Sequence, residues 1–256
     1  MPTGDLDPST WHERRRSFGS VAAGYAALRP TYPADAVAFL LGDRPRRVLD
    51  LGAGTGLLTA VVAAAGHDVV AVDPSGEMLA ELRARHPGVQ ALVGGAEEIP
   101  LPDADVDAVV AGQAAHWFRP APAAAEMRRV LRPGGVVGLV WNTRDEQVPW
   151  VGALGEVLAA ESRDHEADQA VVGDIAAALG ARVERFRSAV VQRIPPDQVV
   201  AGIATRSYVA TMDDDRRAEF LGRVREVLAG HPDTRGRELV DLPYHTDAYR
   251  LTPAPR

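Results

Sequence analysis

Residues 48–56 read Val-Leu-Asp-Leu-Gly-Ala-Gly-Thr-Gly, and this stretch decides the fold. Its apolar residues predict a buried strand whose end carries Asp50, and an apolar helical pattern begins directly after the last glycine. Gly52, Gly54 and Gly56 have no Cβ atom, so the chain can turn sharply between the strand and the helix. Backbone amides at the start of a helix are then open to an approaching ligand. The stretch therefore predicts a cofactor-binding loop.

The glycine spacing distinguishes between two kinds of nucleoside cofactor. A dinucleotide fingerprint has the register G-x-G-x-x-G/A, in which the third glycine lets the helix pack closely on the strand. Counted from Gly52, that third place is Leu57, and the register here is G-x-G-x-G. An NAD-dependent oxidoreductase is therefore the less favoured alternative. Asp73 can accept hydrogen bonds from both hydroxyls of a ribose in either cofactor, or it can cap the helix that follows.

Strands and helices alternate through the middle of the chain, which predicts a mostly parallel sheet with right-handed crossovers. The predicted strands span residues 47–51, 68–72, 89–93, 106–111 and 136–141, and the predicted helices span 34–41, 57–65, 76–85 and 122–131. Later residues are more helical, at 150–160, 173–179, 196–205 and 213–229. Two strand-like runs, 183–194 and 238–250, predict an antiparallel pair at the edge of the sheet.

Read from Asp50 onward, the chain resembles the class I S-adenosylmethionine (SAM)-dependent methyltransferases. The segment Gly94–Asp103 continues the likeness, and Gln113–Phe118 is similar to the Gln-x-x-His-Trp-Phe element of the small-molecule group that includes trans-aconitate methyltransferase. The resemblance spans about residues 18–250 and is strongest between 46 and 142. It implies a Rossmann-like α/β fold with a seven-stranded sheet of order 3-2-1-4-5-7-6, N-terminal lid helices and a helical cap.

One domain is expected overall, in four parts. These are a loose N-terminal segment (1–17), N-terminal lid helices (18–45), a SAM-binding core (46–145), and a C-terminal half (146–256) with the helical cap and the final antiparallel strands.

The resemblance implies SAM as cofactor and S-adenosylhomocysteine as product. The methionine end of SAM would lie over the glycine loop, with Asp50 holding the loop amides or the ligand's ammonium group. Asp73 would hold the ribose. The other residues implied for the cofactor are Gln113 near the methionine end, Met78, Ala96 and Glu97 near the adenine, and Tyr25 and Arg29 from the lid. Met78 could equally belong to the core, and Arg29 could equally complete a helix dipole.

His116 is the candidate catalytic residue. Its imidazole, with an ordinary pKa near ~6.5, could take a proton from a hydroxyl or carboxyl acceptor, or it could anchor its loop by hydrogen bonds. A carboxylate acceptor would need no base, because positioning alone could carry the transfer. The candidate residues for the acceptor are Trp117, Trp141, Asn142, Arg144 and Tyr208.

The composition narrows the possible functions. The chain has 256 residues, 46% of them hydrophobic and 25% charged, which is typical of a soluble globular protein. A net charge of −7 and the absence of the Asp/Asn-Pro-Pro-aromatic tetrad disfavour a nucleic-acid acceptor. The absence of cysteine excludes disulfides and cysteine-ligated iron-sulfur clusters.

The expected protein is therefore a cytoplasmic SAM-dependent methyltransferase. It would move the methyl group to an oxygen, nitrogen or carbon atom of a small molecule such as a carboxylate or a natural-product intermediate. We expect a monomer or homodimer with no metal site and no membrane partner. The alternative from another functional class is a protein that binds SAM without transferring the methyl group.

Overall fold

The computed structural model describes residues 28–159 and 165–255. Residues 18–27 of the predicted lid, Tyr25 among them, lie outside this described part. Contacts within the chain define two compact units, and each is described by itself. The sheet unit comprises Pro30–Asp145, Arg163–Gln192 and Leu242–Arg256, and the helical unit comprises Met1–Arg29, Glu146–Ser162 and Arg193–Asp241.

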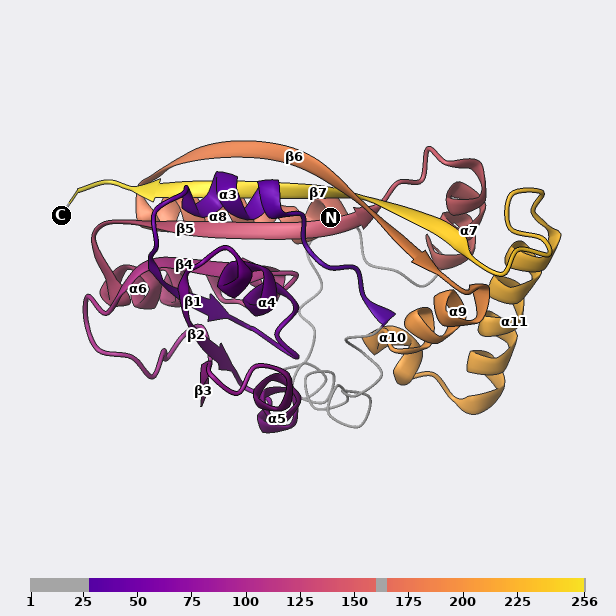
Figure 1. The fold of residues 1–256 in the computed structure, drawn as a ribbon, viewed down its shortest axis with the longest axis horizontal. Helices are drawn as coiled ribbons and strands as arrows, with labels where there is room; N and C mark the ends of the chain where they lie inside the picture. The colour runs from indigo at the N-terminus through magenta and orange to yellow at the C-terminus, as the bar shows by residue number, and fades with distance from the viewer. Residues whose placement is uncertain (1–27, 160–164, 256) are drawn as a thin grey trace, which may run out of the picture. The chain divides into compact units, whose positions relative to one another are not determined.

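The sheet has seven strands in the order β3-β2-β1-β4-β5-β7-β6 (Figure 1). Its strands are β1 (Arg47–Leu51), β2 (Asp68–Asp73), β3 (Gln90–Val93), β4 (Val106–Gly112), β5 (Leu131–Arg144), β6 (Ala181–Ile194) and β7 (Val240–Pro253). The pairs from β3 to β5 are parallel, and β5 pairs with β7 in antiparallel register. The predicted strand order and the mostly parallel sheet are confirmed.

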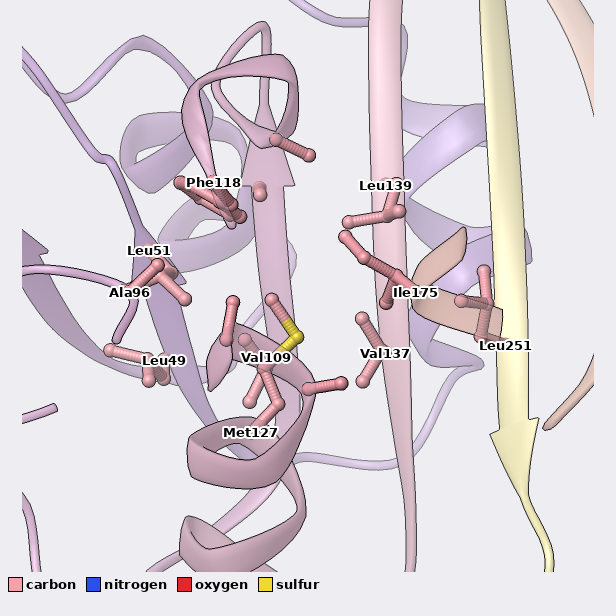
Figure 2. Packing of buried hydrophobic residues seen from close by; sticks show 14 of the residues in the cluster. Leu49, Leu51, Ala96, Val109, Phe118, Met127, Val137, Leu139, Ile175 and Leu251 are labelled. Atoms are coloured by element: carbon pink, nitrogen blue, oxygen red, sulfur yellow. The ribbon is translucent and has the colours of Figure 1, made fainter. Parts of the chain in front are cut away.

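Alternate residues of the central strands bury one face of the sheet against two helices, α6 (Pro120–Val130) and α8 (His165–Leu179). Leu49, Val109 and Val137 reach this layer from three different strands, and Met127 and Ile175 reach it from the two helices (Figure 2). All five side chains are fully buried. This apolar layer fixes the positions of the strand ends from which the candidate site is built.

The opposite face of the sheet packs against helices on its other side, α3 (Ala34–Leu41), α4 (Leu57–Ala64) and α5 (Gly76–Arg85). Val48 and Val110 face Leu40 and Leu58 there. A sheet covered by helices on both faces is the arrangement that alternating strands and helices predict. Asp50 has the same parity as Val48, so its side chain lies on the α4 face.

Two elements extend well beyond their predicted bounds. β5 spans Leu131–Arg144 rather than residues 136–141, because Leu131 pairs with Val106 of β4 and the antiparallel partner β7 pairs with β5 as far as Arg144. α8 begins at His165 rather than at residue 173, so the polar sequence before Val171 continues the helix. The extension of β5 depends on partner strands that are distant in the sequence.

The helical unit contains α7 (Pro149–Ala159), α9 (Pro196–Ala204), α10 (Ser207–Ala210) and α11 (Asp214–Gly230). Helix α11 packs against α7 and α9 through a buried stripe that includes Phe220, Val224 and Leu228. The side chain of Asp213 caps α11 by accepting a hydrogen bond of 2.9 Å from the Arg216 amide. Within the described ranges, none of the helices has the length and apolar character needed to cross a membrane.

Candidate functional site

The glycine loop lies at the carboxyl end of β1, where the strand order reverses between β1 and β4. Open α/β sheets bind ligands in the crevice at such a switch point. Gly52 and Gly56 have φ angles of 75° and 88°, and a Cβ atom at either would come within 3 Å of another side chain. Gly52 would meet Ala114 in the loop after β4, at 2.6 Å. Gly52 therefore lets the loops after β1 and β4 approach each other, and Gly56 lets the start of α4 approach Leu82 of α5.

Gly54 has the same left-handed backbone but a different environment. Its φ angle is 55°, and a Cβ atom built there would meet nothing within 4 Å in residues 28–159 and 165–255. Its N–H donates to Oδ2 of Asp73 at 2.9 Å, so the loop after β1 is tied to the end of β2. The open space beside this backbone can receive a ligand.

Asp50 is a buried carboxyl group with one unused oxygen. Its Oδ2 accepts a hydrogen bond of 2.6 Å from Thr59 Oγ1, whereas Oδ1 has no hydrogen-bond partner among the described residues. Thr55 Oγ1, in the same loop, is likewise buried without one among residues 28–159 and 165–255. Burial raises the pKa of Asp50 to about 7, and the negative charge of Asp73 contributes to the rise. A cationic ligand group here would satisfy Oδ1 and favour the ionised carboxylate.

Asp50→Asn is expected to change how stability depends on pH. Because the folded state holds the Asp50 proton more tightly than the unfolded chain, stability from this group is fully present below pH 3.8 and is lost as the pH rises to about 7. The loss can reach roughly 4 kcal/mol. Asparagine cannot ionise, so the variant should gain stability relative to the wild type between about pH 5 and about pH 8. Urea unfolding of both proteins at these two pH values measures the difference, and parallel pH profiles would contradict it.

The end of β2 presents Asp73, which is 8% exposed. Its Oδ1 accepts from the Ser75 amide at 2.8 Å, and Ser75 rather than Asp73 is the N-cap of α5, accepting from the Met78 amide at 3.3 Å. Capping of the helix therefore does not require Asp73. Met78 is buried in the first turn of α5.

The loop between β3 and β4 holds Ala96 and Glu97. Ala96 is buried in the core, and Glu97 Oε1 accepts from the Arg119 amide, the N-cap position of α6, at 2.9 Å. The Gly94 amide donates to the carbonyl of Asp73 at 3.2 Å, so this loop adjoins the end of β2.

Gln113 and Asn142 connect the ends of β4 and β5. Gln113 has a φ angle of 55°, which is uncommon for a residue with a side chain, and its Nε2 donates to the carbonyl of Asn142 at 2.7 Å. The Asn142 side chain donates to the carbonyl of Thr31 at 3.0 Å and accepts from Thr246 Oγ1 at 2.6 Å. Asn142 is therefore engaged in joining three segments of the sheet unit.

His116 bonds to a second predicted site residue. It lies in a short helical turn, η3 (Ala115–Trp117), and its Nδ1 accepts from the indole Nε1 of Trp141 at 3.4 Å. A neutral imidazole that accepts at Nδ1 carries its proton at Nε2, so in this tautomer Nε2 is a donor. Trp141 is buried in the core, and the Trp117 ring lies 5.1 Å from the His116 ring.

His116→Ala is expected to lower the free energy of unfolding by about 1–3 kcal/mol, because the buried indole N–H of Trp141 loses its acceptor. His116→Asn should recover part of that loss, since the asparagine oxygen can accept in place of Nδ1. Urea unfolding measures both variants. In a Trp141→Phe background, which has no donor, His116→Ala should cost less, and an equal cost in the two backgrounds would contradict the bond.

The remaining predicted residues in the described part are Arg144, Arg29 and Tyr208. Arg144 is buried at the end of β5, opposite Tyr244 of β7. Arg29 and Tyr208 belong to the helical unit, where Arg29 donates to Thr205 Oγ1 at 3.4 Å and the Tyr208 ring packs edge-on against Phe220. In the described part of the chain, no three His, Asp or Glu side chains lie close enough together to hold a metal ion.

Sequence reasoning missed three residues that support the site. Thr59 is a polar residue within the apolar helix that follows the glycine loop, and that position is the signal that could have revealed it. Glu126 and Arg129 hold the loop after β3 from helix α6. Their spacing of three on a helix suggests a local ion pair and gives no indication of that loop.

Comparisons with known proteins agree with this geometry. Residues 49–139 match a family model described as a methyltransferase domain. The chain is 46% identical over 236 residues to an uncharacterized methyltransferase of Mycobacterium tuberculosis (strain H37Rv), covering 92% of this chain and 95% of that protein. It is 38% identical over 150 residues to a malonyl-[acyl-carrier protein] O-methyltransferase of Methylococcus capsulatus, covering 53% of this chain and 54% of that protein.

One solved structure is similar over nearly the whole of its own length. It is that of a candidate type II methyltransferase from Anaeromyxobacter dehalogenans, with a TM-score of 0.67 and 28% sequence identity, covering 89% of this chain and 99% of that one.

Proposed function

The chain belongs to the methyltransferase family, and on this premise we propose that it transfers the methyl group of SAM to a small-molecule acceptor and leaves S-adenosylhomocysteine. The observation that carries the proposal is the open backbone at Gly54, in a loop that follows Asp50 and bonds to Asp73. Among the described residues, a Cβ atom at Gly54 would meet nothing within 4 Å, and the Gly54 amide donates to Asp73 at 2.9 Å. SAM supplies an electrophilic methyl group on a positively charged sulfonium.

The residues present fit such a cofactor. The ammonium group of SAM would satisfy Oδ1 of Asp50, which lacks a hydrogen-bond partner among the described residues. Asp73 would accept from the ribose hydroxyls at the end of the next strand. Binding of a cation beside Asp50 would lower the raised pKa of its carboxyl group, so the affinity for the cofactor should increase as the pH rises toward 7.

The adenine and methionine ends would extend in opposite directions from the ribose. Met78, Ala96 and Glu97 would border the adenine, and Gln113 would adjoin the methionine portion beyond β4. Tyr25 and Arg29 would contribute from the lid, with Arg29 suited to the carboxylate of the methionine moiety.

Positioning is the main catalytic contribution that we assign to the protein's own residues. In the tautomer that the Trp141 bond favours, His116 carries a proton at Nε2 and would orient the acceptor by donating a hydrogen bond. This geometry supports an anchoring and orienting role over that of a general base. Trp117, Trp141, Asn142, Arg144 and Tyr208 remain the proposed residues for acceptor selection, and Arg144 would suit an anionic acceptor.

The acceptor would be an oxygen, nitrogen or carbon atom of a small molecule. The Methylococcus relative is named malonyl-[acyl-carrier protein] O-methyltransferase, and this supports including carboxylates among the first acceptors tested. An already ionised carboxylate requires no proton removal before methyl transfer, which agrees with a positioning role for His116.

Calorimetry with SAM, S-adenosylhomocysteine and NAD tests the cofactor. We expect heat of binding with the first two and none with NAD, and absence of heat with both sulfur nucleosides would overturn the proposal. Transfer of a labelled methyl group from SAM to a panel of carboxylates, phenols and amines then tests the activity. Tight binding without transfer to any acceptor would favour the alternative of a SAM-binding protein that does not methylate.

A further inference from the structure

Two side chains of α6 hold the backbone of the loop between β3 and β4. Glu126 Oε2 accepts from the Ile99 amide at 2.8 Å, and Arg129 Nη2 donates to the Ile99 carbonyl at 2.8 Å. Arg129 Nη1 also donates to the carbonyl of Leu101 at 2.8 Å and to Asp103 Oδ1 at 2.9 Å. The backbone N–H and carbonyl groups of Ile99 are therefore both hydrogen-bonded by side chains of the same helix.

The two side chains also bind each other. Arg129 Nε lies 2.7 Å from Glu126 Oε1, and Arg129 Nη2 lies 2.7 Å from Oε2, which is a bidentate pair. The hydrogen bonds from Arg129 hold the pKa of the Glu126 carboxyl below its usual range. The pair is therefore ionised at neutral pH, and each member fixes the geometry of the other.

Other contacts also restrain the first half of this loop, where Gly95 and Glu98 form an antiparallel bridge and Glu97 Oε1 accepts from the Arg119 amide. It runs outside the sheet, so its peptide groups need partners other than a neighbouring strand. At its start, the Gly94 amide bonds to the carbonyl of Asp73, and farther on Ala96 and Ile99 are buried in the core. The α6 pair supplies the polar restraint at the opposite end.

We propose that Glu126 and Arg129 are positioning residues that set the loop against the base of the bound nucleoside and so determine its selectivity for adenine. The inference rests on the proposed function. A ligand that lies over the loop after β1 and meets Asp73 after β2 extends next to the loop after β3, because these three strands are neighbours. Neither side chain contacts the ligand, so both act through the loop that they hold.

Arg129→Met tests the proposal, and Arg128→Met is its matched control. Arg128 is the adjacent residue of the same helix and also donates to carbonyls, but to those of Leu179 and Ala254 instead of the loop. Calorimetry would compare S-adenosylhomocysteine with S-inosylhomocysteine, in which the adenine amino group is replaced by oxygen. In Arg129→Met we expect at least tenfold weaker binding of S-adenosylhomocysteine. The preference, which is the ratio of the dissociation constants of S-inosylhomocysteine and S-adenosylhomocysteine, should fall toward one. Arg128→Met should keep both the affinity and the preference.

An unchanged preference in a folded Arg129→Met protein would overturn the inference. If that variant does not fold, Glu126→Gln takes its place, because glutamine still accepts from the Ile99 amide but binds Arg129 more weakly. A smaller fall in preference is then expected, and no fall would overturn the inference equally. A wild-type protein that binds neither SAM nor S-adenosylhomocysteine would overturn the proposed function and this inference with it.

Discussion

Replacing Gly54 with alanine is expected to weaken S-adenosylhomocysteine binding at least tenfold, or by about 1.4 kcal/mol. The Cβ atom would enter the space beside the loop, where it meets nothing within 4 Å among the described residues, so it would compete with a ligand bound there. The substitution should also lower the free energy of unfolding by about 1–2 kcal/mol, because an alanine at residue 54 would have to adopt the left-handed backbone conformation. Calorimetry measures the affinity, and urea unfolding measures the stability.

Gly66→Ala is the matched control for this prediction. Gly66 follows the other end of α4, has a φ angle of 88°, and also has nothing within 4 Å of a built Cβ atom. It therefore carries the same kind of backbone strain away from the glycine loop. Equal affinities in the two alanine variants would contradict the assignment of the open space at residue 54 to a ligand.

Asp73→Ala is expected to lower the affinity for S-adenosylhomocysteine by at least ~100-fold. Two hydrogen bonds from ribose hydroxyls to one charged carboxylate are together worth about 3 kcal/mol or more. The substitution also removes the acceptor for the Gly54 amide, which now bonds to the carboxylate at 2.9 Å. The loop after β1 would lose its tie to β2, so the ligand would lose both a direct contact and a preformed loop. Calorimetric titration of the folded variant measures the loss.

Asp68→Ala controls for loss of a carboxylate from the same strand. Asp68 begins β2, and its side chain is 67% exposed and pairs with Arg47 at 2.9 Å. An exposed pair of this kind contributes about 0–1 kcal/mol to stability. This variant should bind like the wild type. If Asp73→Ala bound the ligand as well as Asp68→Ala does, the ribose-binding role would be wrong.

Local signals explain why much of the sheet unit could be predicted from the sequence. The bounds Arg47–Leu51 and Gly76–Arg85 agree with the prediction residue for residue. Each element is delimited by a signal within a few residues, such as the glycines after β1 and the capping Ser75 before α5. The strand order beyond β5 came from the family resemblance and not from any local pattern.

Contacts between distant residues explain what could not be predicted. The length of β5 depends on β7, which lies about a hundred residues later in the chain. The side-chain hydrogen bonds of Asn142 to Thr31 and Thr246, which are 111 and 104 residues away, also have no signal in the sequence. The tautomer of His116 likewise depends on Trp141, and no motif specifies that pair. Hydrogen bonds between residues that are distant in the sequence produce no periodic pattern from which they could be predicted.

The place of β7 between β5 and β6 has a consequence for how the chain acquires its structure during synthesis. The ribosome releases β6 first, at a time when the strand that will lie beside it does not yet exist. Until residues 240–253 emerge, β5 keeps an unpaired edge, and β6 has no hydrogen-bonding neighbour in the sheet. The nascent protein is therefore most exposed to mispairing in the interval before β7 has been synthesised, and a chaperone that shields strand edges would act in that interval.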